Sequence, residues 1–226
     1  MNIFALSADP VESAKQLLDK HVIKMPTETC QMLHTNILYM AYRQTNDKEP
    51  QLKDLKAFHV ACGSRLMKPA MLNHPSTIWA RQSRENFVWL YEHGLALCQE
   101  YTHRYDKVHG SLTRTHDVNI HEDLIYRHGF PHSGLTPVTI AMDDSFRIDI
   151  DKYTQNNPNW TGWDFVITSY RHYYLEGKWR IAEWRNNRRP TWFPSNHCAI
   201  KYNVGVRAYN SKNPKYPQTE LSEELK

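Results

Sequence analysis

The sequence has few of the features that mark disulfide-rich, zinc-ribbon or membrane proteins. Its four cysteines among 226 residues are widely separated and form no CxxC pair. This argues against a disulfide framework or a zinc ribbon and fits a reducing compartment. No segment approaches the roughly 18 consecutive apolar residues of a membrane helix, and no charged-then-apolar leader opens the sequence. We therefore expect a soluble, cytoplasmic protein without membrane contacts.

Signatures of several common enzyme classes are also missing. There is no glycine-rich phosphate loop and no GxSxG elbow, so nothing indicates an NTPase, a dinucleotide-binding enzyme or an α/β-hydrolase. There is no HExxH pair of metal ligands either. We expect no cofactor and assign no metal.

The apolar residues that are present favour one mostly helical domain. They make up 40% of the chain, which is enough for one sizeable core. The clearest helical spacing runs over 75–107, and no repeat or linker divides the chain. We predict a mostly α fold, a single-domain helical bundle with a short N-terminal extended segment over residues 2–7.

Local signals place the other elements. Asp9, followed by Pro10 and Glu12, is typical of a helix start, and Pro26 predicts a kink or a break near Met25. We expect helices over 10–42, 51–67, 137–142 and 162–187, and a polar connection over 109–136 that contains one short helix near 120–128. We also expect a loop over 150–162 and a flexible or surface-bound tail over 205–226.

The C-terminal part of the chain is basic and aromatic. The net charge is only +4, but residues 171–215 contain ten Lys or Arg and two acids, with Trp and Tyr interleaved. Such a stretch can bind phosphates and stack on bases, which favours DNA, in duplex form, as the partner. The alternative is a solvated helix face with a packed aromatic side.

One face of the first long helix carries acid/base groups. His21, Lys24, Glu28 and Gln31 lie at helical offsets of 0, 3, 7 and 10. An imidazole, an amine and a carboxylate on one face can form an acid/base site because each changes the pKa of the others. The alternative is an ordinary exposed Lys–Glu pair.

The remaining candidates are positively charged or histidine-rich. A helix starting at Asn73-His74-Pro75-Ser76 offers free N–H groups to a phosphate, although simple capping explains the same residues. Arg171, Lys178 and Arg185 are seven residues apart, so one helix side could follow a nucleic-acid backbone. The predicted DNA-binding residues are His74, Arg81, Arg84, Arg171, Lys178, Arg185, Arg188, Arg189 and Trp192.

A histidine cluster lies in the connection over 109–132. It contains His109, His116, His121, His128 and His132. Histidine is a common metal ligand, but the cluster has no regular ligand spacing. A loop this rich in histidine is more often simply polar.

Three blocks of residues together resemble a known family. They are Asp19-Lys20-His21 with Glu28, Asn73-His74-Pro75 through Trp79-Ala80-Arg81, and Tyr170 to Tyr174 with Pro190-Thr191-Trp192-Phe193. The chain resembles the small helical proteins of bacteriophages and bacteria that are grouped with pyrimidine-dimer DNA glycosylase/AP lyases of the phage endonuclease V type. The resemblance covers residues 1–193. We therefore expect a glycosylase-like domain there and a C-terminal extension over 194–226.

The resemblance implies an enzyme that acts on a damaged or flipped pyrimidine nucleotide, in the cytoplasm of a bacterial host. The α-amine of Met1 would attack C1′ of the nucleotide and form a Schiff base, with Lys24 as the reserve nucleophile. Glu28 follows His21 by seven residues, as in the family, and would manage charge and protons. The implied catalytic residues are Glu28, His21, Lys24 and Met1.

The sequence also departs from the family's pattern. It begins Met1-Asn2 where the characterised glycosylase has a processed threonine, and it has Gln31 where that enzyme carries an arginine. Other functions therefore stay open. One is a phage DNA-pyrimidine modification transferase that uses the same pocket, and another is a non-catalytic DNA-binding accessory protein. A third is a small-nucleotide or metal-dependent enzyme that uses the histidine cluster.

Overall fold

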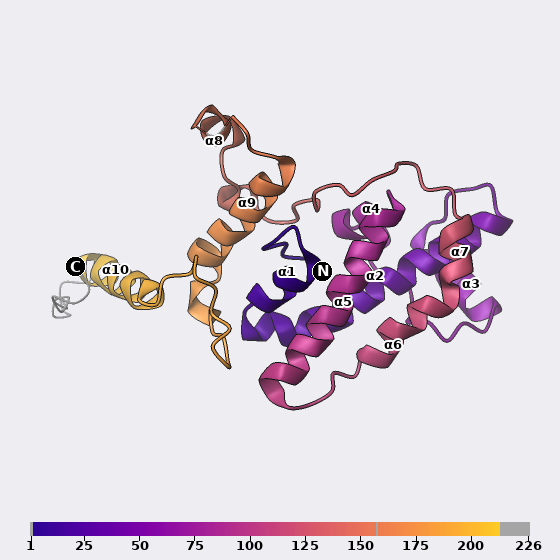
Figure 1. Ribbon diagram of the computed structural model, residues 1–226, viewed down its shortest axis with the longest axis horizontal. Helices are drawn as coiled ribbons and strands as arrows, with labels where there is room; N and C mark the ends of the chain where they lie inside the picture. Colours follow the sequence, from indigo (N-terminus) through magenta and orange to yellow (C-terminus); the bar gives the residue numbers. More distant parts are fainter. Residues whose placement is uncertain (1, 157, 213–226) are drawn as a thin grey trace.

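The protein consists of helices joined by loops (Figure 1). The computed structural model describes residues 2–156 and 158–212, and that part of the chain contains no β-strand. The predicted mostly α fold is confirmed. Residues 2–5 form a buried segment without helical structure at the start of the chain.

The first helix begins where local capping predicts it. α1 spans Pro10–Gln16, and the Asp9 carboxylate accepts a hydrogen bond of 2.7 Å from the Glu12 N–H. This side chain satisfies one of the donors that a helix start leaves unpaired.

The second helix is longer and less interrupted than we expected. α2 spans Asp19–Thr45 and continues through Pro26, so a break near Met25 is wrong. The chain bends earlier, at Leu17 and Leu18, which have extended backbones and fully buried side chains. Burial of both leucines against the core favours the bend at this point.

The strongest predicted helix is divided in two. α4 spans Pro75–Ala80 and α5 spans Arg84–Tyr105, so a single helix over 75–107 is wrong. Ser83 restarts the helix because its hydroxyl accepts a hydrogen bond of 3.1 Å from the Asn86 N–H. α3, at Leu52–Ala61, is likewise shorter than the predicted 51–67.

The core forms where α5 crosses α2 (Figure 1). A Cβ atom at Gly94 of α5 would lie 3.0 Å from the Thr29 methyl group of α2. The absence of a side chain at Gly94 therefore lets the two helices approach closely beside Glu28. Trp79, Phe87 and Leu90 fill the same core and are almost fully buried.

The chain then crosses the α2–α5 pair through short elements. They are α6 at Leu112–His116, the 3-10 helix η1 at Asp117–His121 and α7 at Glu122–Arg127, which confirms the short helix expected near 120–128. The helix expected over 137–142 is wrong. Residue Val138 is buried in a loop, and the Ala141 N–H donates to the Tyr170 hydroxyl at 3.2 Å instead of to a helical carbonyl.

The C-terminal elements also differ from the local pattern. They are η2 at Asp144–Phe146, α8 at Ile150–Asn156, α9 at Gly162–Gly177, η3 at Trp179–Ile181 and α10 at His197–Lys212. α8 replaces part of the loop expected over 150–162. α9 ends ten residues before the predicted 187, because the residues after it leave the helix axis and pack on α1 and α2.

Residues 179–193 attach the C-terminal part to the N-terminal core. Trp184 and Trp192 donate indole hydrogen bonds of 3.0 and 2.7 Å to the backbone and side chain of Gln16. Phe193 is buried at the end of this segment. α10 then projects away from the body (Figure 1), so residues 205–212 of the expected tail are helical, while 213–226 lie outside the described residues. The boundary at 193 stays a prediction.

Among the described residues, no helix combines the length and the apolar character that crossing a bilayer requires.

Candidate active site and nucleic-acid interface

Lys24 and Glu28 form an ion pair on the face of α2. Lys24 Nζ lies 2.9 Å from Glu28 Oε1, one helical turn away. The Lys24 side chain is 69% exposed, whereas the Glu28 side chain is only 15% exposed. The carboxylate is therefore held in a partly buried position, and the amine reaches it from solvent.

The neighbours of Glu28 on α2 are held from both sides. Thr29 packs against Gly94 of α5, as described above. On the other side, the Gln31 amide lies 3.4 Å from the Lys68 carbonyl of the loop between α3 and α4. Gln31 thus contacts protein backbone at the position where the characterised glycosylase carries an arginine.

His74 lies close enough to Glu28 for the two charges to interact. Its Nδ1 atom caps α4 by accepting a hydrogen bond of 3.2 Å from the Ser76 N–H. Partial burial lowers the pKa of His74, and the negative charge of Glu28 acts in the opposite direction. The structure thereby brings together two of the three sequence blocks that carry the family resemblance.

His21 is separated from the solvent that Lys24 reaches. Its ring stacks on Phe4 with 4.0 Å between centroids, and its Nδ1 lies 2.6 Å from the Tyr174 hydroxyl. Burial, followed by the charges of Lys178 and Lys24, lowers its pKa to about 3. His21 is therefore neutral near pH 7 and is placed to orient Tyr174 and Phe4.

The start of the chain is anchored beside α9. The Asn2 carboxamide donates to the Ala141 carbonyl at 2.7 Å and accepts from the Tyr170 hydroxyl at 2.7 Å. Both partners lie far along the sequence, so this anchor exists only in the folded protein. Met1, the predicted nucleophile, lies outside the described residues.

The N-terminal half of the chain matches a known protein family. Residues 1–112 match the family described as pyrimidine dimer DNA glycosylase. This half of the chain belongs to that family. It contains the Lys24–Glu28 pair and His74, and the membership indicates a role in DNA repair. No curated protein and no solved structure matches the chain.

Arg81 and Arg84 also lie within residues 1–112, the glycosylase half, and each guanidinium group stacks over a tyrosine ring. Arg81 donates to the Leu72 carbonyl at 2.7 Å and lies 4.6 Å from the centroid of Tyr39, and burial lowers its pKa. Arg84 is exposed and lies 3.9 Å from the centroid of Tyr126. Both guanidinium groups therefore already have partners, and Arg84 is the one that solvent reaches.

The basic residues beyond the glycosylase half do not form one helical ladder. Lys178 and Arg185 lie after the end of α9, so the seven-residue spacing does not align them with Arg171 on one helix. Arg171 itself is half-buried, donates to the Leu6 carbonyl at 3.1 Å and stacks 5.4 Å from the Trp192 ring.

Arg185 and Arg188 join a buried cluster of charges. Asp19 and Glu100 are almost fully buried, and both accept hydrogen bonds from the buried Arg104. Arg188 Nε lies 3.0 Å from Glu100 Oε1, and Arg185 Nε lies 3.6 Å from Asp19 Oδ2. The sequence analysis missed this cluster, because its members are distant along the chain and no local spacing links them.

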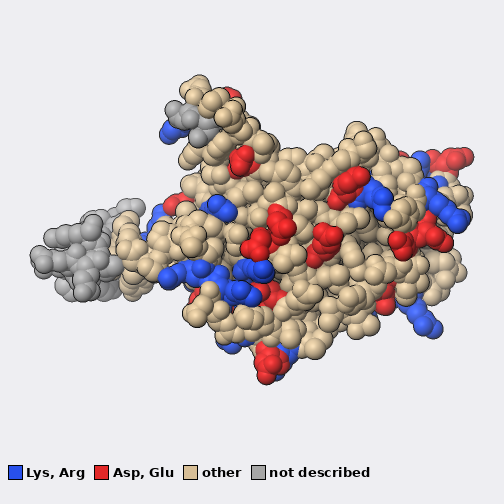
Figure 2. Space-filling view, viewed as in Figure 1, with Lys and Arg blue, Asp and Glu red and all other residues tan. Residues whose placement is uncertain are grey.

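Three of the predicted C-terminal cations stay near the surface, and one of them is Arg185, whose side chain is 62% exposed despite its contact with Asp19. Lys178 is half-buried, with its amine 4.9 Å from the Tyr173 ring, and Arg189 is exposed beside Trp184 and Asn187. Figure 2 shows Lys and Arg side chains gathered over the lower end of α9 and the loop after it, while carboxylates lie across the middle of the same face.

The histidine cluster is dispersed in the fold. The His109 ring contacts the Ile23 carbonyl of α2, and the His128 ring packs edge-to-face on Tyr39 and Phe130. Among the residues that the structure describes, no three His, Cys, Asp or Glu side chains are grouped as a metal ion would require.

Proposed function

We propose that the protein is a DNA glycosylase with AP lyase activity that acts on a damaged or flipped pyrimidine nucleotide. The observation that carries the proposal is the position of Glu28 within the glycosylase half. It is partly buried, paired with Lys24 at 2.9 Å and electrostatically coupled to His74. A carboxylate beside amines can support both the loss of a base and the proton transfers of a Schiff-base reaction.

The proposed reaction begins with attack on the sugar. A neutral amine attacks C1′ while the bond between C1′ and the pyrimidine breaks, and the base leaves with the bonding electrons and takes up a proton. Ring opening of the sugar and loss of the nitrogen's protons give an imine between the amine and C1′. Removal of a C2′ proton expels the 3′ phosphate and cuts the strand. Water then hydrolyses the imine and releases the amine.

The roles of the residues follow from their surroundings. The Met1 α-amine is the proposed nucleophile, because an ordinary α-amine titrates near about 7.7–8.0 and is partly neutral at physiological pH. Lys24 is the reserve nucleophile, and its pairing with Glu28 keeps a proton-transfer partner at hand. Glu28 takes and returns protons. His21 is a positioning residue, because it is buried against Phe4 and Tyr174.

The proposed DNA contacts come from the exposed cations. Arg84, Arg185 and Arg189 are exposed, and Lys178 is half-buried. The path of the strand would be bordered by four residues whose side chains are already fixed by protein contacts, namely His74, Arg81, Arg171 and Trp192. Duplex DNA is the proposed substrate form.

Borohydride trapping on duplex DNA that contains an abasic site or a pyrimidine dimer tests the chemistry. The wild-type protein should give a covalent adduct and a cut strand. Glu28→Gln should lower strand cleavage by at least about 100-fold while DNA binding is retained, since it removes charge and proton transfer but keeps shape. Glu12→Gln is the matched control, because Glu12 is a similar carboxylate paired with Lys15 on α1.

The identity of the amine is tested separately. If the Met1 α-amine attacks C1′, acetylation of the α-amine should abolish the adduct. If Lys24 attacks, Lys24→Ala should abolish it. The control Lys15→Ala should leave the adduct unchanged in both cases. A wild-type protein that binds DNA but yields neither adduct nor cleavage would refute the lyase mechanism. Release of a base without an adduct would identify a glycosylase that lacks lyase activity, and transfer of a group to an intact base would identify the modification transferase. Binding alone would identify the accessory protein.

A further inference from the structure

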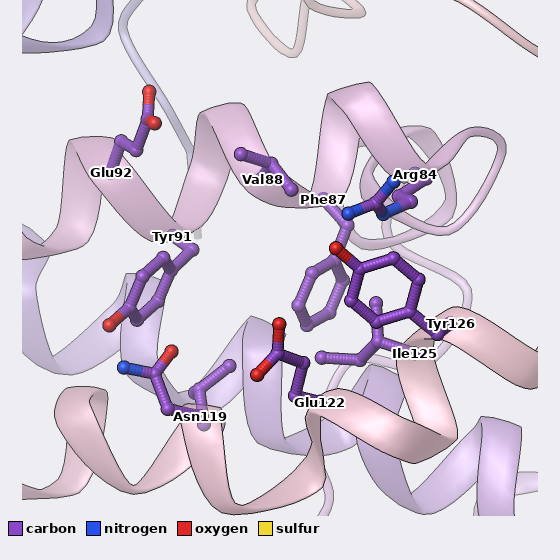
Figure 3. A pocket seen from close by; sticks show the side chains of 10 residues that line it. Arg84, Phe87, Val88, Tyr91, Glu92, Asn119, Glu122, Ile125 and Tyr126 are labelled. Carbon is purple, nitrogen blue, oxygen red and sulfur yellow. The ribbon is translucent and has the colours of Figure 1, made fainter.

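A cavity of about 190 Å³ lies between α5 and the η1–α7 segment, away from Glu28. Its floor is apolar, because Phe87, Val118 and Ile125 are each at most 8% exposed. Val88 and Tyr126 border its mouth and are 37% and 58% exposed. Figure 3 shows the space open between the two helical segments, with side chains from both directed into it.

The charged residues that line the cavity are two acids and one base, Arg84. Glu92 of α5 and Glu122 of α7 both line it and are exposed, and the Glu122 carboxylate points into the space (Figure 3). Within the described part of the chain, neither carboxylate forms an ion pair. An apolar floor beneath two such carboxylates suits a ligand that joins a positive charge to a hydrocarbon body.

The aromatic wall of the cavity already holds one cation. The guanidinium of Arg84 lies 3.9 Å from the ring centroid of Tyr126 at one end of the space (Figure 3). Tyr91 forms the wall at the other end, beside Asn119. Aromatic rings attract cations through the negative charge on their faces, so the second ring adds to the preference set by Glu92 and Glu122.

The geometry points to a binding site for a small protonated amine on an apolar body, held by Glu122 above the floor of Phe87, Val118 and Ile125, with Glu92 adding negative charge at the rim. The site is independent of the proposed glycosylase chemistry. The carboxylates of its rim attract an ammonium group. The small volume favours a ligand, or a part of a ligand, of roughly the size of one amino-acid side chain.

NMR titration of the full-length protein with benzylamine and n-butylamine tests the site. Shifts should saturate at the resonances of α5 and α7, with dissociation constants in the range of about 1–10 mM that so few ligand atoms allow. Benzyl alcohol and benzoate have similar bodies but no positive charge, and they should bind at least about fivefold more weakly than benzylamine. Tighter binding of n-butylamine would identify a linear amine, and tighter binding of benzylamine an aromatic one.

Variants test the carboxylates and the cavity. The double variant Glu92→Gln with Glu122→Gln should weaken benzylamine binding at least about fivefold, as expected for two exposed ionic contacts. Glu85→Gln is the matched control on the same helix, because Glu85 accepts from the Gly134 N–H and lies outside this cavity, and it should bind as the wild type does. Val88→Lys should place an internal amine over the carboxylates and block the probe.

The expected outcomes separate this site from the glycosylase proposal. The double glutamine variant should retain the wild-type circular dichroism spectrum and any strand cleavage, because it changes only exposed side chains away from Glu28. Equal binding of benzyl alcohol and benzylamine, unchanged benzylamine binding in the double variant, or an absence of saturable shifts would each overturn the proposal. None of these results bears on the reaction assigned to Glu28.

Discussion

Replacement of Arg104 by Met should destabilise the protein more than any surface change. Arg104 is fully buried and donates four hydrogen bonds, to the Asp19 and Glu100 carboxylates and to the Leu17 and Lys15 carbonyls. The Asp19 and Glu100 side chains are only 8% and 4% exposed, so Arg104→Met leaves two carboxylates in the interior without their main partner. Removing one member of a buried ion pair costs about 3–5 kcal/mol.

Urea unfolding followed by circular dichroism measures this loss. With a denaturant slope of about 2–3 kcal/mol per M, the midpoint should fall by about 1 to 2.5 M. Lys15→Met is the control, because its ion pair with Glu12 is exposed and should contribute less than about 1 kcal/mol.

A triple variant tests the cause. Adding Asp19→Asn and Glu100→Gln to Arg104→Met removes the buried charges, so the triple variant should be more stable than Arg104→Met alone. Arg185 and Arg188 then lose their carboxylate partners, but water can solvate both side chains, so this loss should change the free energy of unfolding little. A loss below about 1 kcal/mol in Arg104→Met, or a triple variant no more stable than the single one, would refute the reasoning.

Three further predictions follow from burial, packing and exposure. His21 has a folded pKa of about 3, below its unfolded value of 6.5, so its contribution to stability is complete above pH 6.5. That contribution declines by about 1 kcal/mol for each pH unit as the pH falls towards 3. The imidazole NMR signals of His21 should not titrate between about pH 5 and 8, and a titration in that range would contradict the burial. Gly94→Val should cost about 1–3 kcal/mol in thermal unfolding because it collides with Thr29, whereas Gly110→Ala, which meets no atom within 4 Å, should cost little. Arg189→Ala should lower the slope of log K against log salt for duplex DNA by about one without loss of stability, and an unchanged slope would remove Arg189 from the interface.

Helix starts and the helical class were predictable from the sequence, because they depend on neighbours in the chain. Asp9 caps α1 through the Glu12 N–H, three residues away. The shared face of Lys24 and Glu28 follows from helix geometry alone, and their ion pair at 2.9 Å agrees with it. The same local reasoning found the apolar stripe of α5.

The positions of helix ends and the contacts of most charged side chains depended on residues distant in the sequence. Gly177 is a local stop signal at the end of α9, but the direction that the chain takes afterwards depends on Asp19 and Gln16, more than 150 residues earlier. The break at Ser83 combines a local cap, in which the Ser83 hydroxyl accepts from the Asn86 N–H, with a distant contact, in which the Asn86 amide donates to Thr136, 50 residues later. Only the distant contact is absent from the local pattern.

The candidate site shows the same division. The sequence by itself determined which residues share a helix face and which carry charge, and it made Lys24, Glu28 and His74 candidates. Only the tertiary structure decided exposure. It buried His21 against Phe4 and Tyr174 and drew Arg185 and Arg188 towards buried carboxylates, while Arg189 stayed in solvent. Burial sets the pKa of a group and its access to DNA, and burial arises from packing between segments that lie far apart in the chain.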